Sequence, residues 1–102
     1  MKEEVINNLK KLCTILNEGG ETHYSDHIEE VLRKNDDEIW QYLCSNGLWG
    51  GAGSIADQAL LGNSELRKKM DYLLVELGEF QIRSGQTNVR TEMWVSAFKQ
   101  WK

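Results

Sequence analysis

Apolar residues recur at intervals of three or four along most of this chain, and that spacing restricts the fold to helices. Near the start they are Val5, Ile6, Leu9, Leu12, Cys13 and Leu16, with charged and amide side chains between them. This interval places them on one face of an amphipathic helix. The chain has no proline, and strand-like alternation is confined to a short stretch near its end. We therefore predict an all-α fold whose first helix ends at Gly19-Gly20.

Two shorter helices are expected after that glycine pair. The first covers residues 22–34 and begins at a hydroxyl side chain, either Thr22 or Ser25. The second begins at Asn35, which has the spacing of a capping box with Glu38. Asn-Gly at positions 46–47 then ends that helix.

The second half of the chain predicts the longest helix and a final one. Residues 65–83 carry leucines in helical register and follow an Asn63-Ser64 cap. Residues 89–101 also read as a helix, with a strand over 89–95 as the alternative. Five to six helices joined by short turns predict a compact orthogonal bundle. We expect one domain, residues 1–102, centred on the first and the longest helix.

Between the two halves lies a glycine-rich stretch that predicts a structural loop. Ser54 is a good N-cap three residues before Asp57, so a short helix is expected from Ile55 to Leu61, stopped by Gly62. A phosphate-binding loop would need a lysine next to the serine, and a dinucleotide site would need a preceding strand. Both are missing, and Asp57 would oppose an anion. The residues of this predicted structural loop are Gly50, Gly51, Gly53, Ser54 and Asp57.

Acidic residues are concentrated in one segment. Residues 21–38 hold seven acids and two bases and carry a net charge of −5, whereas the whole chain carries −4, so the remainder is +1. Such a surface favours a basic partner and repels nucleic acid. A solvated face that keeps the protein soluble is the alternative interpretation.

No motif in the sequence indicates catalysis, a metal or a cofactor. His23 and His27 have the i,i+4 spacing of zinc ligands, but the glutamate of the zinc-protease motif and any third histidine are missing. We interpret them as exposed histidines. Cys13 and Cys44 lack the spacing of a zinc site and are expected to be reduced thiols, with a disulfide between them as the alternative. We predict no catalytic residue, no metal and no cofactor.

The same composition restricts the environment of the protein. No apolar run approaches the roughly 20 residues needed to cross a bilayer. The first residues lack the order of a signal peptide. Arg67-Lys68-Lys69 is the only basic cluster, too little for a nucleic-acid interface. We expect a cytoplasmic protein that binds neither membranes nor nucleic acid.

The stretch Trp49-Gly50-Gly51-Ala52-Gly53-Ser54-Ile55-Ala56-Asp57 resembles the signature of a small helical bacterial family, an aromatic residue followed by Gly-Gly-x-Gly-Ser-aliphatic-x-Asp. The resemblance extends over about residues 36–82, including the leucine-rich helix. Such proteins are similar to immunity proteins of polymorphic or contact-dependent toxin systems, which bind a cognate toxin and block it. Ala52 departs from the bulkier residue expected there. The family signature looks structural and assigns no binding residue.

Two function hypotheses follow. The first is an immunity protein, monomeric when free, that neutralises a basic toxin domain, with a nuclease as one candidate. Charged contacts would come from Glu29, Glu30, Asp36, Asp37 and Glu38, and an apolar anchor from Trp40 or Trp49. The second is a helical interaction or regulatory module without a toxin partner. Its signature would be an exposed stripe of Trp94, Phe98 and Trp101, suited to a homodimer.

Overall fold

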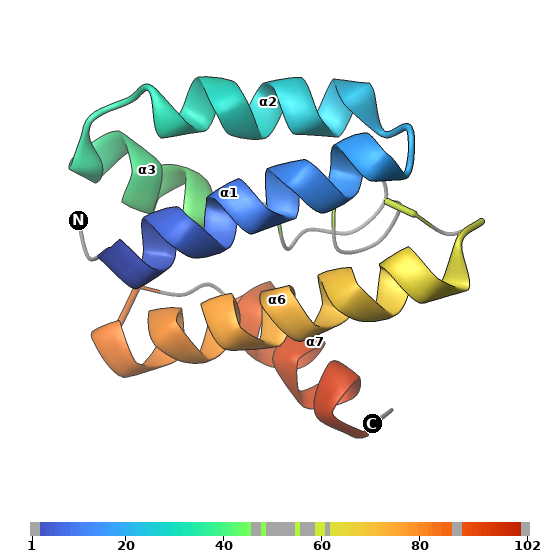
Figure 1. Ribbon diagram of the computed structural model, residues 1–102. Helices are drawn as coiled ribbons and strands as arrows, with labels where there is room; N and C mark the ends of the chain where they lie inside the picture. Colours follow the sequence, from blue (N-terminus) through green and yellow to red (C-terminus); the bar gives the residue numbers. More distant parts are fainter. Residues whose placement is uncertain are drawn as a thin grey trace.

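The computed structural model describes residues 3–45, 48, 55, 59–60, 62–86 and 89–100. They form five helices and no strand, as Figure 1 shows: α1 (Glu3–Glu18), α2 (Thr22–Leu32), α3 (Asp36–Leu43), α6 (Ser64–Ser84) and α7 (Val89–Gln100). For these residues the predicted all-α class is confirmed. The segment near the C-terminus is helical, so the alternative of a strand over 89–95 is wrong.

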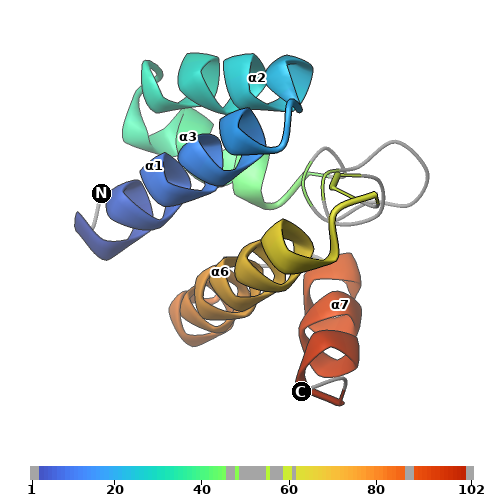
Figure 2. The ribbon, with the colours of Figure 1, turned by 45° about the vertical axis from the view of Figure 1, so that its right-hand side comes forward.

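Helix α1 lies between α2 and α6 (Figure 1). It packs against both of them, while α3 contacts α2 and α7 packs on α6. In Figure 2 the same order is seen from another side, with α7 on the side of α6 away from α2. The radius of gyration is 12.3 Å, close to the roughly 13 Å of a compact chain of 100 residues. As predicted, α1 and α6 hold central places in the structure.

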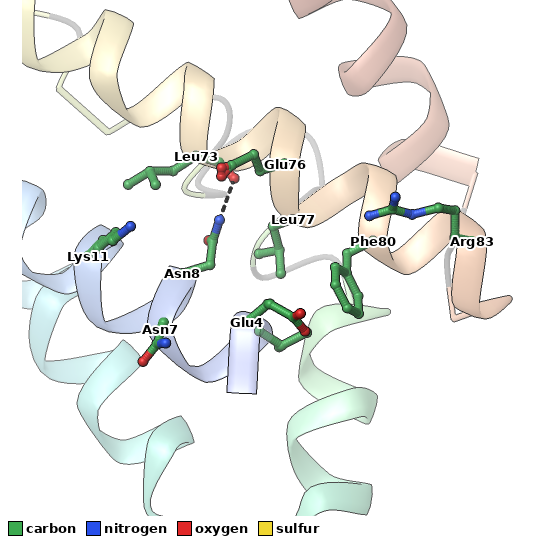
Figure 3. A pocket seen from close by; sticks show the side chains of 10 residues that line it. Glu4, Asn7, Asn8, Lys11, Leu73, Glu76, Leu77, Phe80 and Arg83 are labelled. Atoms are coloured by element: carbon green, nitrogen blue, oxygen red, sulfur yellow. Dashed lines mark hydrogen bonds between the residues drawn. The ribbon is translucent and has the colours of Figure 1, made fainter. Parts of the chain in front are cut away.

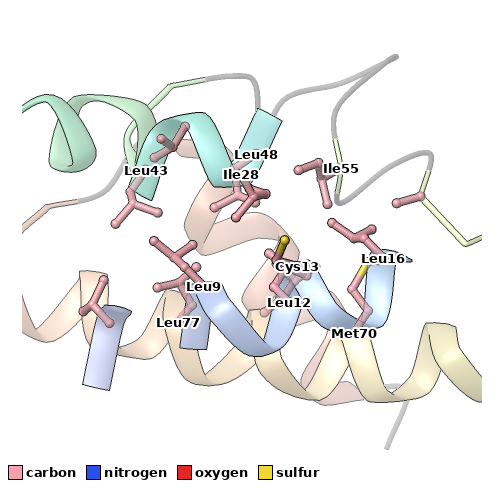
Figure 4. Packing of buried hydrophobic residues seen from close by; sticks show 14 of the residues in the cluster. Leu9, Leu12, Cys13, Leu16, Ile28, Leu43, Leu48, Ile55, Met70 and Leu77 are labelled. Atoms are coloured by element: carbon pink, nitrogen blue, oxygen red, sulfur yellow. The ribbon is translucent and has the colours of Figure 1, made fainter. Parts of the chain in front are cut away.

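The core is built from the apolar stripes of these helices (Figure 4). Leu9, Leu12 and Leu16 of α1 are fully buried, as the periodicity predicts. They meet residues from every other part of the described chain, including Leu48 and Ile55 from the connection between α3 and α6. The largest fully buried side chains are Leu9, Leu12, Leu16, Ile28, Ile39, Leu43, Leu48, Ile55, Met70 and Leu74.

Helices α1 and α6 both end at a glycine in the left-handed conformation. Gly20 has φ 78° and Gly85 has φ 72°, a backbone region that glycine enters without a steric cost. After α1, the amide of Gly20 donates to the Asn17 carbonyl at 3.1 Å and that of Glu21 to the Leu16 carbonyl at 2.8 Å. These two bonds define a Schellman motif. The predicted stop at Gly19-Gly20 is confirmed.

The predicted caps are right for α3 and α6 and wrong for α2, although α2 begins at Thr22, where its predicted range of 22–34 begins. The side chains of Asn35 and Asn63 accept the amides of Glu38 and Leu66, at 2.9 and 3.1 Å. Helix α2, however, begins after Glu21, whose side chain makes no capping bond. Ser25 is fully buried instead, with its Oγ 3.2 Å from the thiol of Cys13. The hydroxyl of Ser25, a predicted cap of α2, therefore contacts Cys13 of α1 instead of capping its own helix.

The connection that leads into α6 turns at Leu60 rather than at Gly62. Leu60 has φ 61°, a left-handed conformation that costs a non-glycine residue about 1–2 kcal/mol. Its amide donates to Glu21 Oε1 at 3.3 Å, and its carbonyl accepts the Asn63 amide at 3.1 Å. The prediction that Gly62 stops the preceding helix is wrong, because neighbouring elements hold Leu60 in the turn. Most of the predicted helix 55–61 lies outside the described residues.

Among the described residues, no helix combines the length and apolar content that crossing a membrane requires.

Candidate binding surface

The five acids predicted to bind a partner all lie on α2 and α3 and are all exposed. Glu29 and Glu30 belong to the second half of α2, and Asp36, Asp37 and Glu38 form the first turn of α3. Only the short segment 33–35 separates the two helices, and α2 contacts α3. The fold therefore places the end of α2 and the start of α3, which carry these residues, at one corner of the molecule (Figure 1). We call this set of five residues the acidic corner.

Part of the acidic corner stabilises the helix on which it lies. Three acids in the first turn of α3 interact favourably with the positive end of the helix dipole. Glu38 does more, because its carboxylate accepts the side-chain amide of Asn35 at 2.9 Å and lies 3.7 Å from Lys34 Nζ. That half-exposed ion pair contributes at most about 1 kcal/mol. Glu38 is thus committed to the start of α3.

Glu29 is also engaged by the protein itself. Its Oε1 lies 3.7 Å from the thiol of Cys13, which reaches it from α1. Glu30 and Asp37, by contrast, form no ion pair or side-chain hydrogen bond within the described part of the chain, and both point into solvent. A partner can contact these two carboxylates without dismantling a structural bond. Glu30 and Asp37 are therefore the members of the acidic corner best suited to intermolecular contact.

Of the two tryptophans predicted as apolar anchors, Trp40 belongs to the described residues and Trp49 does not. Trp40 lies on α3 beside the acidic corner and is half-buried, packed against the core cluster. Its remaining exposed surface adjoins the acids of the preceding turn. Trp49 lies outside the described residues, as do all five members of the predicted structural loop: Gly50, Gly51, Gly53, Ser54 and Asp57.

The two histidines of α2 belong to no metal centre among the described residues. His23 and His27 are exposed on α2, and each contacts a tyrosine ring edge-on, with centroid distances of 5.7 Å to Tyr24 and 5.1 Å to Tyr42. In the described ranges, no group of three or more His, Cys, Asp or Glu side chains is arranged to hold a metal ion. Neither Cys13 nor Cys44 is part of a disulfide, so the disulfide alternative is wrong.

Sequence reasoning missed a second surface, on the side of α1 away from α2. An open hollow of about 490 Å³ lies between α1 and α6, lined by Lys11, Thr14, Ile15, Lys68, Lys69, Tyr72 and Leu73. The lysines come from two helices far apart in the sequence. Taken separately, Lys11 and the Lys68-Lys69 pair look like the solvated sides of two amphipathic helices, and only the packing of α1 on α6 brings them together. The one available signal was Tyr72, an aromatic residue outside the apolar register of its helix.

The stripe proposed for the last helix is only partly visible. Trp94 is half-buried and packs against the core, while the side chain of Phe98 and all of Trp101 lie outside the described residues. Met93 is the large apolar side chain of α7 that stands out, at 56 % exposure. This does not favour the homodimer hypothesis.

Comparison of the chain with protein-family models, with curated proteins and with solved structures finds no match in any of the three. The helices of the described residues place the chain in the all-α class.

Proposed function

We propose that this protein is a bacterial immunity protein, which binds a basic toxin domain through the acidic corner and blocks it without catalysis. The observation that carries the proposal is the exposure of Glu30 and Asp37, two carboxylates with no structural bond in the described chain, on the two helices that carry the acidic corner. The resemblance of segment 49–57 to the immunity-type signature supports the choice of a toxin as partner. Contact-dependent inhibition, with a nuclease as the toxin, fits an acidic surface that takes the place of phosphate.

The remaining parts of the proposal concern shape and place. A cytoplasmic location would put the inhibitor where an incoming toxin acts. We also propose the finer description of the fold, an orthogonal bundle of five to six helices, because α7 crosses behind α6 rather than running beside it in Figure 1. We propose a monomer in the free state, because Trp94 is packed into the core rather than left open for a second copy.

The test uses the toxin domain encoded by the reading frame adjacent to this gene. The Glu30→Gln/Asp37→Asn double variant should bind this domain about tenfold more weakly at low ionic strength, and the difference should shrink as salt is added. The matched control is Glu18→Gln/Glu65→Gln, which removes two exposed acids from α1 and α6 and changes the net charge equally. Control affinity should equal that of the wild type.

Growth of cells expressing the toxin gives the functional readout. Wild-type protein and the control variant should restore growth, and the Glu30→Gln/Asp37→Asn variant should restore it less. Equal affinity and equal salt dependence for both double variants would contradict the acidic-corner mechanism. Failure of the wild-type protein to bind the adjacent toxin domain at all would contradict the immunity function itself.

A further inference from the structure

Two adjoining hollows lie along the seam between α1 and α6. The first is the 490 Å³ hollow described above. The second is a hollow of about 390 Å³ nearer the N-terminus of α1, which is drawn in Figure 3. Lys11 and Leu73 line both hollows, so the two parts join at these residues. We call the whole feature the α1–α6 groove.

The floor of the groove is apolar and fixed in place. In the first hollow it consists of Ile15, Leu73 and Tyr72, and Tyr72 is 66 % exposed. Beyond Leu73, the side chain of Asn8 crosses from α1 to α6, where its Nδ2 donates to the Leu73 carbonyl at 3.0 Å (Figure 3). Asn8 itself is 8 % exposed, and this partly buried bond ties the two helices together. The groove is consequently a preformed surface rather than one that must open.

Positive charge is concentrated at one end. Three lysines, Lys11, Lys68 and Lys69, line the first hollow with no acid among them. The second hollow has two bases and two acids, Lys11, Arg83, Glu4 and Glu76. A ligand lying along the groove would therefore meet a net positive field at its Lys68 end and a balanced one at its Arg83 end.

The dimensions fit a helix. On α6 the lining residues extend from Lys68 to Arg83, which at 1.5 Å per residue is about 22 Å, or about four helical turns. An amphipathic helix laid along such a seam would place its apolar face on Tyr72 and Leu73. A small ligand would leave most of its surface in water, because the first hollow is open to solvent along its length.

We propose that the α1–α6 groove binds an amphipathic helix of a partner protein, with acidic residues flanking the apolar face at the end that meets Lys68 and Lys69. A second copy of this chain would not fit, because its acidic helices α2 and α3 bury their own apolar faces, including Ile28 and Ile39. The groove is lined by residues of α1 and α6, whereas the acidic corner belongs to α2 and α3, and α2 and α6 lie on opposite sides of α1 (Figure 1). This inference is therefore independent of the immunity function.

The probe is a synthetic helical peptide of about 18 residues, with leucines on one face and glutamates beside them. A matched peptide carries lysine at every glutamate position. Fluorescence anisotropy at low ionic strength should show the acidic peptide binding at least about tenfold more tightly than the basic one, since rim charges of opposite sign steer association. Equal binding of the two peptides, or no binding of the acidic one, would overturn the proposal.

Two pairs of variants locate the site. Lys11→Glu should weaken binding of the acidic peptide about fivefold or more, whereas Lys10→Glu, the neighbour that lines neither hollow, should leave it unchanged. Tyr72→Ser should weaken binding of the acidic peptide to a similar extent. Its control is Ile82→Ser, which should not weaken binding, because Ile82 is an exposed apolar residue of the same helix that lies outside the groove. All four positions are on the surface, and circular dichroism verifies the helical content of each variant. Equal losses in a variant and its control would overturn the assignment of the groove.

Two further measurements distinguish other occupants. Vesicles containing phosphatidylglycerol present negative charge above an apolar layer. The protein could bind these vesicles, lose that binding in Lys11→Glu and Tyr72→Ser, and fail to bind the acidic peptide. That result would overturn the proposal and identify a membrane surface as the occupant of the groove. Sedimentation that shows a dimer dissociated by Tyr72→Ser would replace it with self-association. The proposal is supported if the protein is monomeric, does not bind the vesicles and binds the acidic peptide.

Discussion

The side chain of Leu60 fills the space in which a side chain at Gly19 would begin. A Cβ atom on Gly19 would overlap with Leu60 Cδ2 and would lie 3.3 Å from Leu66 Cδ1. Leu60 is itself 2 % exposed and held in a left-handed turn, so it has little freedom to withdraw. The end of α1 and the turn before α6 are thus fitted to each other at a position where only glycine leaves enough room.

Gly19→Ala should therefore destabilise the protein. Insertion of one methyl group into this contact should lower the free energy of unfolding by about 1–3 kcal/mol. Gly62→Ala is the control, because nothing lies within 4 Å of its added Cβ and its φ is not in the left-handed region. That control should leave stability unchanged or raise it by up to about 1 kcal/mol. Urea unfolding followed by circular dichroism measures both, and equal midpoints would contradict the contact.

Arg67 holds the same turn from the other side. Its Nη1 donates to the Ala59 carbonyl at 2.6 Å, and its Nε lies 3.1 Å from Asp71 Oδ1, with both side chains about 15 % exposed. Arg67→Met would leave a carbonyl and a carboxylate without this donor, at an expected cost of about 1–3 kcal/mol. Lys68→Met, the exposed neighbour, should cost less than about 0.5 kcal/mol. Thermal unfolding measures both variants, and equal midpoints for Arg67→Met and Lys68→Met would contradict the role of Arg67.

The helices of this protein could be predicted because their signals are local. The apolar rhythm of α1, the caps Asn35 and Asn63, and the stop at Gly20 each depend on residues a few positions apart. Ser25 and Leu60 were misjudged for the opposite reason. Cys13 of α1 takes the hydroxyl that would have capped α2, and Glu21 supplies the bond that lets a leucine adopt a positive φ.

For the same reason, the acidic corner could be predicted from the sequence and the α1–α6 groove could not. The acidic corner is continuous in the sequence, so its charge could be read directly, although the bonds that engage Glu29 and Glu38 could not. The α1–α6 groove joins Lys11 to Lys68 and Lys69 across the packing of two helices. No periodicity within one segment reports such a pairing.

Gln81 joins the C-terminal end of α6 to that of α3. It is fully buried, and its Nε2 donates to the carbonyls of Leu43 and Gln86, both at 2.9 Å. Gln81→Met keeps the length of the side chain but removes the donor, so the buried bond to Leu43 and the partly buried bond to Gln86 are both lost. We expect a loss of about 1–3 kcal/mol in the free energy of unfolding. Gln41→Met, at an exposed position of α3, is the control, and an equal effect in both would show that the buried bonds contribute nothing.

Tyr42 offers the opposite case, a substitution expected to stabilise. Its hydroxyl is buried without a hydrogen-bond partner, and its ring lies edge-on to His27. Tyr42→Phe keeps the ring and removes the unsatisfied group, so the free energy of unfolding should rise by up to about 1 kcal/mol at pH 7.

The pH dependence of stability tests the same environment of Tyr42. Burial raises the pKa of Tyr42 above its ordinary value of 10.0. Above about pH 10 the unfolded chain therefore releases a proton that the folded protein keeps, and stability must fall as the pH rises. Tyr42→Phe removes this contribution, so its advantage over the wild type should grow between about pH 9 and pH 11. Urea unfolding at several pH values measures the difference in the free energy of unfolding between Tyr42→Phe and the wild type. A difference that does not change with pH would mean that the phenol is not buried in solution.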